Sequence, residues 1–328
     1  MRPFEYQRAD DPAHAVALLD GDPDAAYLAG GTNLVDHLKL GVATPGRLVD
    51  VRHLGLDEVE ETDDGLRVGA NVRNSTLAAH PLVRERWPAV ARALLAGASG
   101  QLRHQATTGG NLLQRTRCVY FQDVTTPCHK REPGSGCSAI GGYERYDAVL
   151  GASESCVAVH PSDLAVALAC VDAQVVVLGR DGERRVPATE LHRLPGDHPE
   201  RDTVLEHGEL ITAVELPATQ AARRSTYVKV RDRASYAFAL VSVAAAVELD
   251  GDTVRDVRLA WGGVAHKPWR AGRAEAALTA RRLSDDGISA AVDLELVAAR
   301  TTEQTAYKLP MVRGATLTAL HRLQEGLQ

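Results

Sequence analysis

The sequence contains no apolar run long enough to span a bilayer, so we expect no membrane insertion. Acidic residues outnumber basic ones, 43 to 37, and the net charge of −6 argues against nucleic acid as a partner. The first residues, MRPFEYQRADDPAHAVALL, show neither the apolar core of a signal peptide nor a twin-arginine signal. We therefore expect a cytoplasmic protein, although a subunit without a signal can also reach the periplasm folded, together with a signal-bearing partner.

Aromatic residues are scarce, at 4% of the chain, so we expect a core of small and aliphatic side chains. With 328 residues and 45% hydrophobic content, the chain is long enough for two domains with a core each. No repeat of fixed period is present. The N-terminal part mixes short strands and helices, and the C-terminal part has strands followed by helices, which is typical of an α+β domain.

The expected elements lie on both sides of an irregular stretch. Strands are predicted at 25–28, 47–51, 66–69, 174–178 and 209–217, and helices at 13–19, 89–98 and from 162 or 163 to about 170. The small, polar stretch ATQAARRS after Pro217 is the predicted domain boundary. Beyond it we expect strands at 227–230, 240–249 and 254–260, and helices at 268–280, 284–300 and 311–323.

Two similar glycine turns are the first candidates for a binding site. YLAGGTNL, residues 27–34, places two glycines directly after a short apolar strand, and TTGGNL, residues 107–112, repeats the pattern. Glycine tolerates positive φ, and successive backbone N–H groups in such a turn form a concavity that binds anions. Neither turn matches G-x-G-x-x-G, so a Rossmann dinucleotide fold is unsupported. The pair indicates either two tight turns or one phosphate-bearing ligand held between them.

The cysteines are few and clustered, and none belongs to a C-x-x-C pair. Cys118, Cys128, Cys137 and Cys156 fall within 39 residues, on a stretch that is rich in Gly, Pro, Arg and Ser and shows no periodicity. The gaps of 9, 8 and 18 residues are too long for the usual zinc pairs, and disulfides do not suit an intracellular chain. Four thiolates on one loop suit a [4Fe–4S] cluster. Cys170, in the run LAVALACVDAQVVV, is expected to be a small buried hydrophobe.

Longer segments resemble a known family. Five segments resemble the FAD-binding medium subunit of molybdenum hydroxylases, the xanthine dehydrogenase and aldehyde oxidoreductase family. They are LAGGTNLVDHLK, TTGGNLLQRTRCVYF, PSDLAVAL, ELITAVELP and the later YVKVRDRASYAFALVSVAAAV. The stretch RCVYFQDV, followed by PCHKREPGSGC and a fourth cysteine, is similar to the subgroup whose flavin subunit carries an extra [4Fe–4S] cluster. Periplasmic-type aldehyde oxidoreductases have this insertion, and 4-hydroxybenzoyl-CoA reductase has a related one.

The resemblance implies a fold of the α+β class in two parts. Residues 1–217 would form a vanillyl-alcohol-oxidase/p-cresol-methylhydroxylase type FAD-binding domain of two α/β subdomains. The [4Fe–4S] loop would be inserted into it at 115–157. Residues 222–328 would form the α+β flavoprotein C-terminal domain of the molybdenum hydroxylases.

The resemblance also implies two sets of site residues and no catalytic residue. The first turn would hold the FAD pyrophosphate, the second would meet the cofactor from the other side, and three single residues would contact it. The FAD residues would be Leu28, Ala29, Gly30, Gly31, Thr32, Asn33, Leu34, Asp36, Thr107, Thr108, Gly109, Gly110, Asn111, Asp163, Ile211 and Lys229. Asp163 would hydrogen-bond the adenosine end of FAD, Ile211 would pack on FAD, and Lys229 would lie near it. Two alternative interpretations stay open: Asp163 could be only a helix cap, and Lys229 only a solvated lysine of a strand. The cluster ligands would be Cys118, Cys128, Cys137 and Cys156.

The implied function is electron transfer in a heterotrimer. In this family a large molybdopterin-binding subunit hydroxylates the substrate, a small subunit with two [2Fe–2S] clusters passes the electrons on, and FAD reduces an external acceptor. We expect these two subunits and that acceptor as partners. Two alternatives are a stand-alone FAD-dependent reductase of the same fold, for which the cysteines would be unexplained, and a zinc-stapled scaffold that is not an enzyme.

Overall fold

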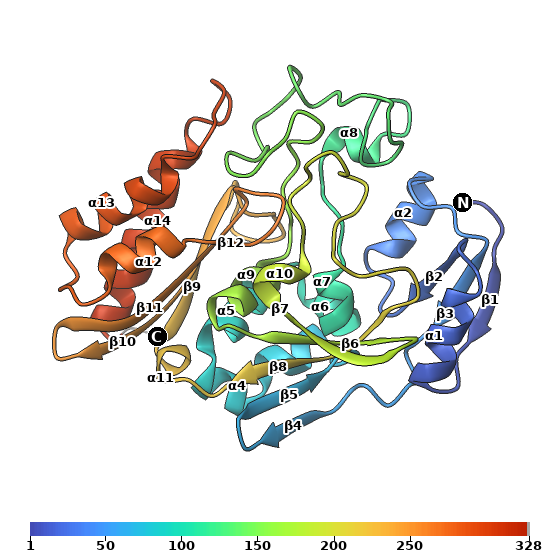
Figure 1. Ribbon diagram of the computed structural model, residues 1–328, viewed down its shortest axis with the longest axis horizontal. Helices are drawn as coiled ribbons and strands as arrows, with labels where there is room; N and C mark the ends of the chain where they lie inside the picture. Colours follow the sequence, from blue (N-terminus) through green and yellow to red (C-terminus); the bar gives the residue numbers. More distant parts are fainter. Residues whose placement is uncertain (327–328) are drawn as a thin grey trace.

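Three sheets organise the chain in the computed structural model, which describes residues 1–326 (Figure 1). The N-terminal sheet is parallel, in the order β1-β3-β2. Helices connect its strands, as parallel pairing requires. Its elements are β1 (Glu5–Arg8), α1 (Pro12–Asp20), β2 (Ala25–Leu28), α2 (Leu34–Leu40) and β3 (Arg47–Asp50).

The second sheet is antiparallel, and its strands come from both sides of the irregular stretch. The order is β4-β5-β8-β6-β7, with β4 (Val59–Thr62), β5 (Gly65–Gly69), β6 (Gln174–Gly179), β7 (Gly182–Pro187) and β8 (Leu210–Pro217). Short helices from the intervening chain share its core. They are α3 (Asn74–Ala79), α4 (Pro81–Arg86), α5 (Pro88–Ala96), α7 (Thr108–Leu112), α9 (Asp163–Cys170) and α10 (Ala188–Leu191), while α6 (Gly100–Gln105) buries none of its residues.

The third sheet is antiparallel too, and three helices pack against it (Figure 1). Its order is β12-β11-β10-β9, with β9 (Ser225–Val230), β10 (Val241–Asp250), β11 (Thr253–Gly262) and β12 (Trp269–Arg270). The helices are α12 (Gly272–Leu278), α13 (Asp285–Leu296) and α14 (Lys308–Gln324). Trp87 and Trp261 are fully buried, but aliphatic and alanine side chains form most of the core, as the composition predicts.

Most predicted elements are present, with two corrections. The helix expected at 268–280 begins only at Gly272, because Trp269 and Arg270 pair with β11 as β12. The helix expected at 284–300 ends at Leu296, and Ser284 caps its start. The stretch expected as the domain boundary contains α11 (Gln220–Arg223), which buries two alanines in the core of the second sheet.

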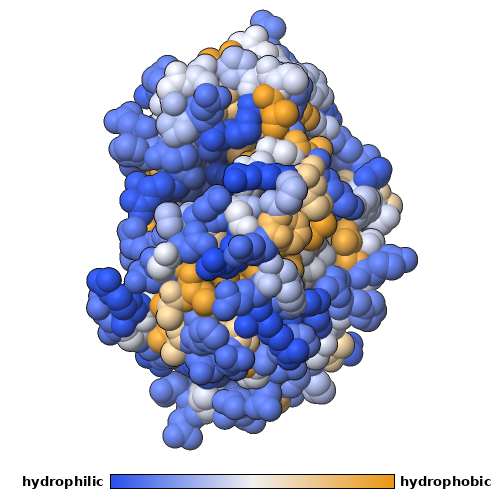
Figure 2. Space-filling view, turned by 90° about the vertical axis from the view of Figure 1, so that its right-hand side faces the viewer, coloured by the Kyte–Doolittle hydropathy of each residue, from blue (hydrophilic) through white to orange (hydrophobic). Residues whose placement is uncertain are grey.

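The irregular stretch lies at the top of the molecule in Figure 1 and has little regular structure, as predicted. Between α7 and α9 the described chain has one helix, α8 (Val119–Gln122), and isolated bridges. Figure 2 shows the face beside the N-terminal sheet, which is mostly hydrophilic with separate hydrophobic patches. None of the helices within residues 1–326 combines the length and hydrophobicity needed to cross a membrane.

Candidate FAD and cysteine site

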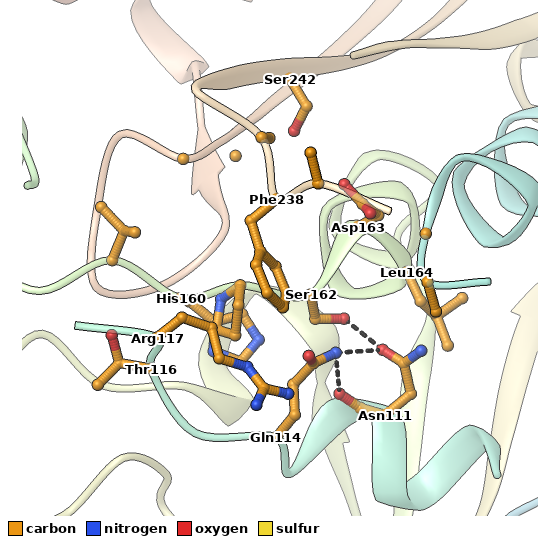
Figure 3. A pocket seen from close by; sticks show the side chains of 18 of the residues that line it. Asn111, Gln114, Thr116, Arg117, His160, Ser162, Asp163, Leu164, Phe238 and Ser242 are labelled. Atoms are coloured by element: carbon orange, nitrogen blue, oxygen red, sulfur yellow. Dashed lines mark hydrogen bonds between the residues drawn. The ribbon is translucent and has the colours of Figure 1, made fainter. Parts of the chain in front are cut away.

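A cavity of about 600 Å³ lies where the glycine turns, the irregular stretch and the third sheet meet. This volume is in the range of small-molecule and cofactor sites. Its lining includes the start of α9 and the loop between β9 and β10, so segments far apart in the sequence form its walls. Figure 3 shows part of this lining, with polar side chains on several sides and Phe238 between them.

Eight predicted site residues line this cavity, and the others lie behind them or elsewhere. Those in the lining are Thr32, Asn33, Asp36, Gly110, Asn111, Cys118, Asp163 and Lys229. Outside it are Leu28, Ala29, Gly30, Gly31, Leu34, Thr107, Thr108, Gly109, Ile211, Cys128, Cys137 and Cys156. Ile211, on β8, is 3% exposed and packs in the core of the second sheet, whereas the family resemblance implies that it packs on FAD.

The first glycine turn joins β2 to α2, and its two glycines serve different needs. Gly31 has a φ of 74°, a conformation that other residues rarely adopt. Gly30 is required by space: a Cβ there would lie 2.3 Å from the carbonyl oxygen of Gln105, directly before the second turn. The two turns are therefore in contact, which the sequence suggested only by their similarity. Asn33 strengthens the link, since its Oδ1 accepts a hydrogen bond from the backbone of Arg115 at 2.9 Å.

The second turn is the beginning of α7, not a positive-φ turn. Neither of its glycines has positive φ, so the expected conformational reason for them is wrong. Gly109 is needed because a Cβ would lie 3.1 Å from the Cβ of Ala70, while the Thr107 hydroxyl caps the helix by accepting from Gly110 N at 3.2 Å. Asn111 presents its side chain to the cavity and accepts a hydrogen bond from Ser162 at 2.6 Å (Figure 3).

Asp163 and Lys229 form a buried ion pair at the cavity wall. Their Oδ2 and Nζ atoms are 2.7 Å apart, and the two side chains are only 9% and 4% exposed. Ser162, not Asp163, caps α9, because its hydroxyl accepts from Ala165 N at 3.0 Å. The Tyr227 hydroxyl donates to Asp163 Oδ1 at 2.5 Å, and burial, followed by the charge of Asp163, raises the pKa of Tyr227 well above its usual value. The readings of Asp163 as a cap and of Lys229 as a solvated lysine are thus wrong.

Five polar residues of the lining that the sequence reasoning did not assign have a buried atom without a hydrogen-bond partner in the described chain. These atoms are Asn74 Oδ1, Arg117 Nε, Asp147 Oδ2, His160 Nε2 and Ser242 Oγ. Buried polar atoms are normally paired, so five unpaired ones around one cavity indicate a polar ligand. The sequence offered one signal for two of these residues: Arg117 directly precedes Cys118, and His160 directly precedes the PSD motif.

Arg117 and His160 both lie near Phe238 in Figure 3 and have well-defined surroundings. The Arg117 guanidinium lies 5.0 Å from the centroid of the Phe238 ring, and burial lowers its pKa. The imidazole of His160 lies 4.0 Å from that of His192, centroid to centroid, and burial lowers the pKa of both rings, that of His192 to about 4. Arg117 is thus a cationic group and His160 a neutral polar group of the lining.

The four clustered cysteines are free and close enough to influence one another. Cys128 and Cys137 face each other in an isolated antiparallel bridge. Burial raises the pKa of Cys118 to about 11, with a contribution from Cys128, and that of Cys156 to about 12, with contributions from Cys137 and Cys118. Within residues 1–326, no three or more His, Cys, Asp or Glu side chains are arranged to hold a metal ion, so the cluster stays a prediction. Cys170 is fully buried, as expected.

A buried charged network holds the irregular stretch in place. Asp202 accepts a hydrogen bond from Arg115 Nε at 2.6 Å and another from Lys130, whose side chain is 1% exposed. His266 Nε2 lies 3.7 Å from the same carboxylate. Burial acts to raise the pKa of Asp202, but these three neighbours lower it well below its usual value. The carboxylate therefore stays charged and ties both basic residues of the stretch to the loop before β8.

Comparisons with known proteins agree with this geometry. Residues 2–219 match the family described as FAD binding domain in molybdopterin dehydrogenase, and residues 226–322 match the CO dehydrogenase flavoprotein C-terminal domain. The aldehyde oxidoreductase FAD-binding subunit PaoB of Escherichia coli is 49% identical over 322 residues, 98% of each chain. This chain belongs to the FAD-binding medium subunits of the xanthine dehydrogenase and aldehyde oxidoreductase family.

Two more distant relatives support the same assignment. The glyceraldehyde dehydrogenase medium chain of Sulfolobus acidocaldarius is 28% identical, over 86% of this chain and 83% of its own. Among solved structures, carbon monoxide dehydrogenase from Hydrogenophaga pseudoflava superposes with a TM-score of 0.77 at 25% identity, over 98% of each chain. The chain is an FAD-binding subunit of a molybdenum hydroxylase, and the α+β fold is confirmed. A scaffold that is not part of an enzyme is excluded.

Proposed function

We propose that this chain carries FAD and a [4Fe–4S] cluster and transfers electrons in a heterotrimeric aldehyde or heteroaromatic oxidoreductase. Electrons from a small partner with two [2Fe–2S] clusters reach FAD, which reduces an external acceptor, while a large molybdopterin-binding partner oxidises the substrate. One observation carries the proposal: Cys118, the first of the four cysteines, lines the same cavity as both glycine turns. The assignment to an aldehyde substrate follows the PaoB relative.

The cavity residues fit FAD by their chemistry. Thr32, Asn33, Gly110 and Asn111 would hold the pyrophosphate, since small and amide side chains let the backbone approach phosphate oxygens. Arg117 would offset the phosphate charge or contact the ring system. FAD supplies the electron-accepting ring, and the protein binds it, excludes water and sets its potential. We assign this work to residues 1–217, with residues 222–328 closing the cavity through the β9–β10 loop.

The cysteine loop fits a four-iron cluster by its donor set. Four thiols on one loop supply the four ligands that such a cluster takes. The buried thiols of Cys118 and Cys156 hold their protons in the unliganded chain, and iron would displace them, as metal binding does at cysteine sites. Because Cys118 also lines the FAD cavity, the cluster would lie next to the cofactor. Its first role would be to stabilise residues 115–157 and influence the electrostatics of FAD, with electron relay as a second role.

The surface of this loop supports a protein partner. Five large hydrophobic side chains between residues 119 and 146 are 44 to 52% exposed: Val119, Val124, Ile140, Tyr143 and Tyr146. Exposed apolar groups gathered on one loop are typical of an interface. A partner that covers this loop would bring its own redox centres toward the cavity. The assembled enzyme would work in the cytoplasm, or in the periplasm if the chain is exported folded with a signal-bearing partner.

Replacing Cys128 with Ser tests the cluster directly. We expect the purified variant to lose iron and the broad brown absorption of a [4Fe–4S] protein, and to unfold at a lower temperature. Cys170→Ser is the matched control, since Cys170 is buried outside the loop and its Sγ lies 3.4 Å from the carbonyl of Arg258, which a hydroxyl can also contact. Unchanged iron and stability in Cys128→Ser would refute the cluster and its structural role.

Two further measurements separate the remaining alternatives. If Cys128→Ser loses iron but the reconstituted heterotrimer turns over normally, the cluster is structural and does not relay electrons. A stand-alone reductase would oxidise NADH when the chain is purified alone. We expect no such activity without the partners, and substantial NADH oxidation by the isolated chain would favour the reductase.

A further inference from the structure

Asp147 is a buried carboxyl that faces the cavity without a partner. It is 7% exposed, it belongs to the lining, and its Oδ2 has no hydrogen-bond partner in the described chain. An unpaired, buried carboxyl oxygen is costly unless a ligand or a proton satisfies it. Neither the glycine turns nor the cysteine set explains it.

The neighbours of Asp147 do not neutralise it by hydrogen bonding. Lys308 of α14 is fully buried nearby, but its Nζ donates to the backbone carbonyls of Tyr146, Asp147 and Gly263, at 3.1, 2.7 and 2.7 Å. The hydrogen-bond donors of Lys308 Nζ are therefore taken by these three backbone carbonyls and are not given to the Asp147 carboxylate. Burial raises the pKa of Asp147 to about 7; Lys308 opposes the shift and Glu144, on the same loop, adds to it.

The wall that carries Asp147 is fixed to the third sheet. Tyr146 and Arg145 both donate to Asp232, at 3.0 and 2.8 Å, and Asp232 lies on the β9–β10 loop that also carries Phe238. Lys308 ties the same wall to Gly263, directly after β11. These contacts fix the wall on which Asp147 lies, and its Oδ2 is left without a hydrogen-bond partner in the described chain.

We propose that Asp147 faces the flavin bound in this cavity and binds a proton when that flavin is reduced. The inference rests on the proposed FAD site. Two electrons come from the iron–sulfur partner, and one proton from solvent binds the ring, so the ring system gains one negative charge. A second solvent proton then binds the Asp147 carboxylate, because two negative charges repel each other strongly in a buried site. In total, two electrons and two protons are taken up, and no bond other than O–H and N–H is formed.

The test is the pH dependence of the flavin reduction potential in the full chain with FAD bound. Reduction by a chemical reductant is followed by flavin absorbance from about pH 5 to about pH 9. Above about pH 7, we expect the potential of the wild type to fall about twice as steeply with pH as that of Asp147→Asn, which binds one proton fewer. Asp147→Glu should retain the steep region, shifted in pH. Asp252→Asn, on an exposed ion pair, should match the wild type.

The outcomes separate this proposal from the FAD site itself. Identical pH profiles for the wild type and Asp147→Asn, with FAD bound in both, would overturn the role of Asp147 and leave the site intact. Loss of FAD from both Asp147 variants, with unchanged unfolding temperatures, would make Asp147 a binding residue only and also overturn the proposal. If a variant in which Gly110 and Asn111 are replaced retains FAD as the wild type does, the proposed FAD site is wrong instead.

Discussion

Lys229 and Asp163 are joined by an ion pair of 2.7 Å that links β9 of the third sheet to α9 of the second. Lys229 also donates to the carbonyl of Ala96, at the end of α5, at 3.2 Å. One ammonium group therefore holds three elements together at the cavity wall. Because both charges are buried, each is compensated mainly by the other.

Lys229→Met should destabilise the chain strongly. It leaves the buried Asp163 carboxylate without its cation, and breaking a buried pair in this way costs roughly 3–5 kcal/mol. Equilibrium unfolding in urea measures the loss. Asp252→Asn is the comparison, because its pair with Arg282 is 73 to 75% exposed and should contribute less than about 1 kcal/mol. Equal losses for the two variants would contradict the structural role of the buried pair.

Gly30→Ala should weaken both stability and FAD binding. The new Cβ would lie 2.3 Å from Gln105 O, so the two glycine turns would have to move apart, at a cost of roughly 1–3 kcal/mol. FAD content of the purified chain and the midpoint of unfolding are the two measurements. Gly314→Ala is the control: it lies within α14 with no atom within 4 Å of its Cβ, and should stabilise by up to about 1 kcal/mol. If Gly30→Ala is purified with its full content of FAD, close contact at Gly30 is not required for FAD binding.

The sequence predicted the site best where a residue type has one local reason to be present. The glycine turns, Asp163 and Lys229 lie together as the family resemblance implies, although Gly109 serves close packing and not positive φ. The reason is that steric need depends on the partner segment, here Ala70, which the local sequence does not reveal. The contact of Ile211 with FAD, which only the family resemblance implies, stays a prediction.

Residues brought to the cavity by irregular chain were not predicted. Arg117, Asp147 and His160 lie on segments without periodicity, whose course depends on long-range contacts such as the pairing of Arg115 and Lys130 with Asp202. The strand β12 was missed for the same reason, because only its partner β11 makes it a strand. The regular elements, by contrast, followed from hydrophobic pattern and capping residues.

Arg117→Met should reduce FAD affinity without destabilising the apo chain. The buried guanidinium has an unpaired Nε, so removing its charge costs the empty cavity little, while bound FAD loses a charge-assisted hydrogen bond of roughly 1.5–3 kcal/mol. That corresponds to a dissociation constant about tenfold to hundredfold higher. Fluorescence titration of the apo chain with FAD gives the affinity, and urea unfolding gives the stability. Arg84→Met, on the exposed side of α4, should change neither. Unchanged FAD affinity in Arg117→Met would show that Arg117 does not contact the cofactor.

The buried histidines should make the chain sensitive to mild acid. The pKa of His192 is lowered from 6.5 to about 4, mainly by burial, so between these values the unfolded chain binds a proton that the folded chain does not. Stability therefore falls as pH drops from about 6.5 to about 4, by about 3 kcal/mol for this residue. His192→Gln, whose amide can still donate to Leu112 O, should show a shallower decline in urea unfolding across this range, whereas exposed His53→Gln should follow the wild type. A decline as steep in His192→Gln as in the wild type would assign the acid sensitivity to other groups.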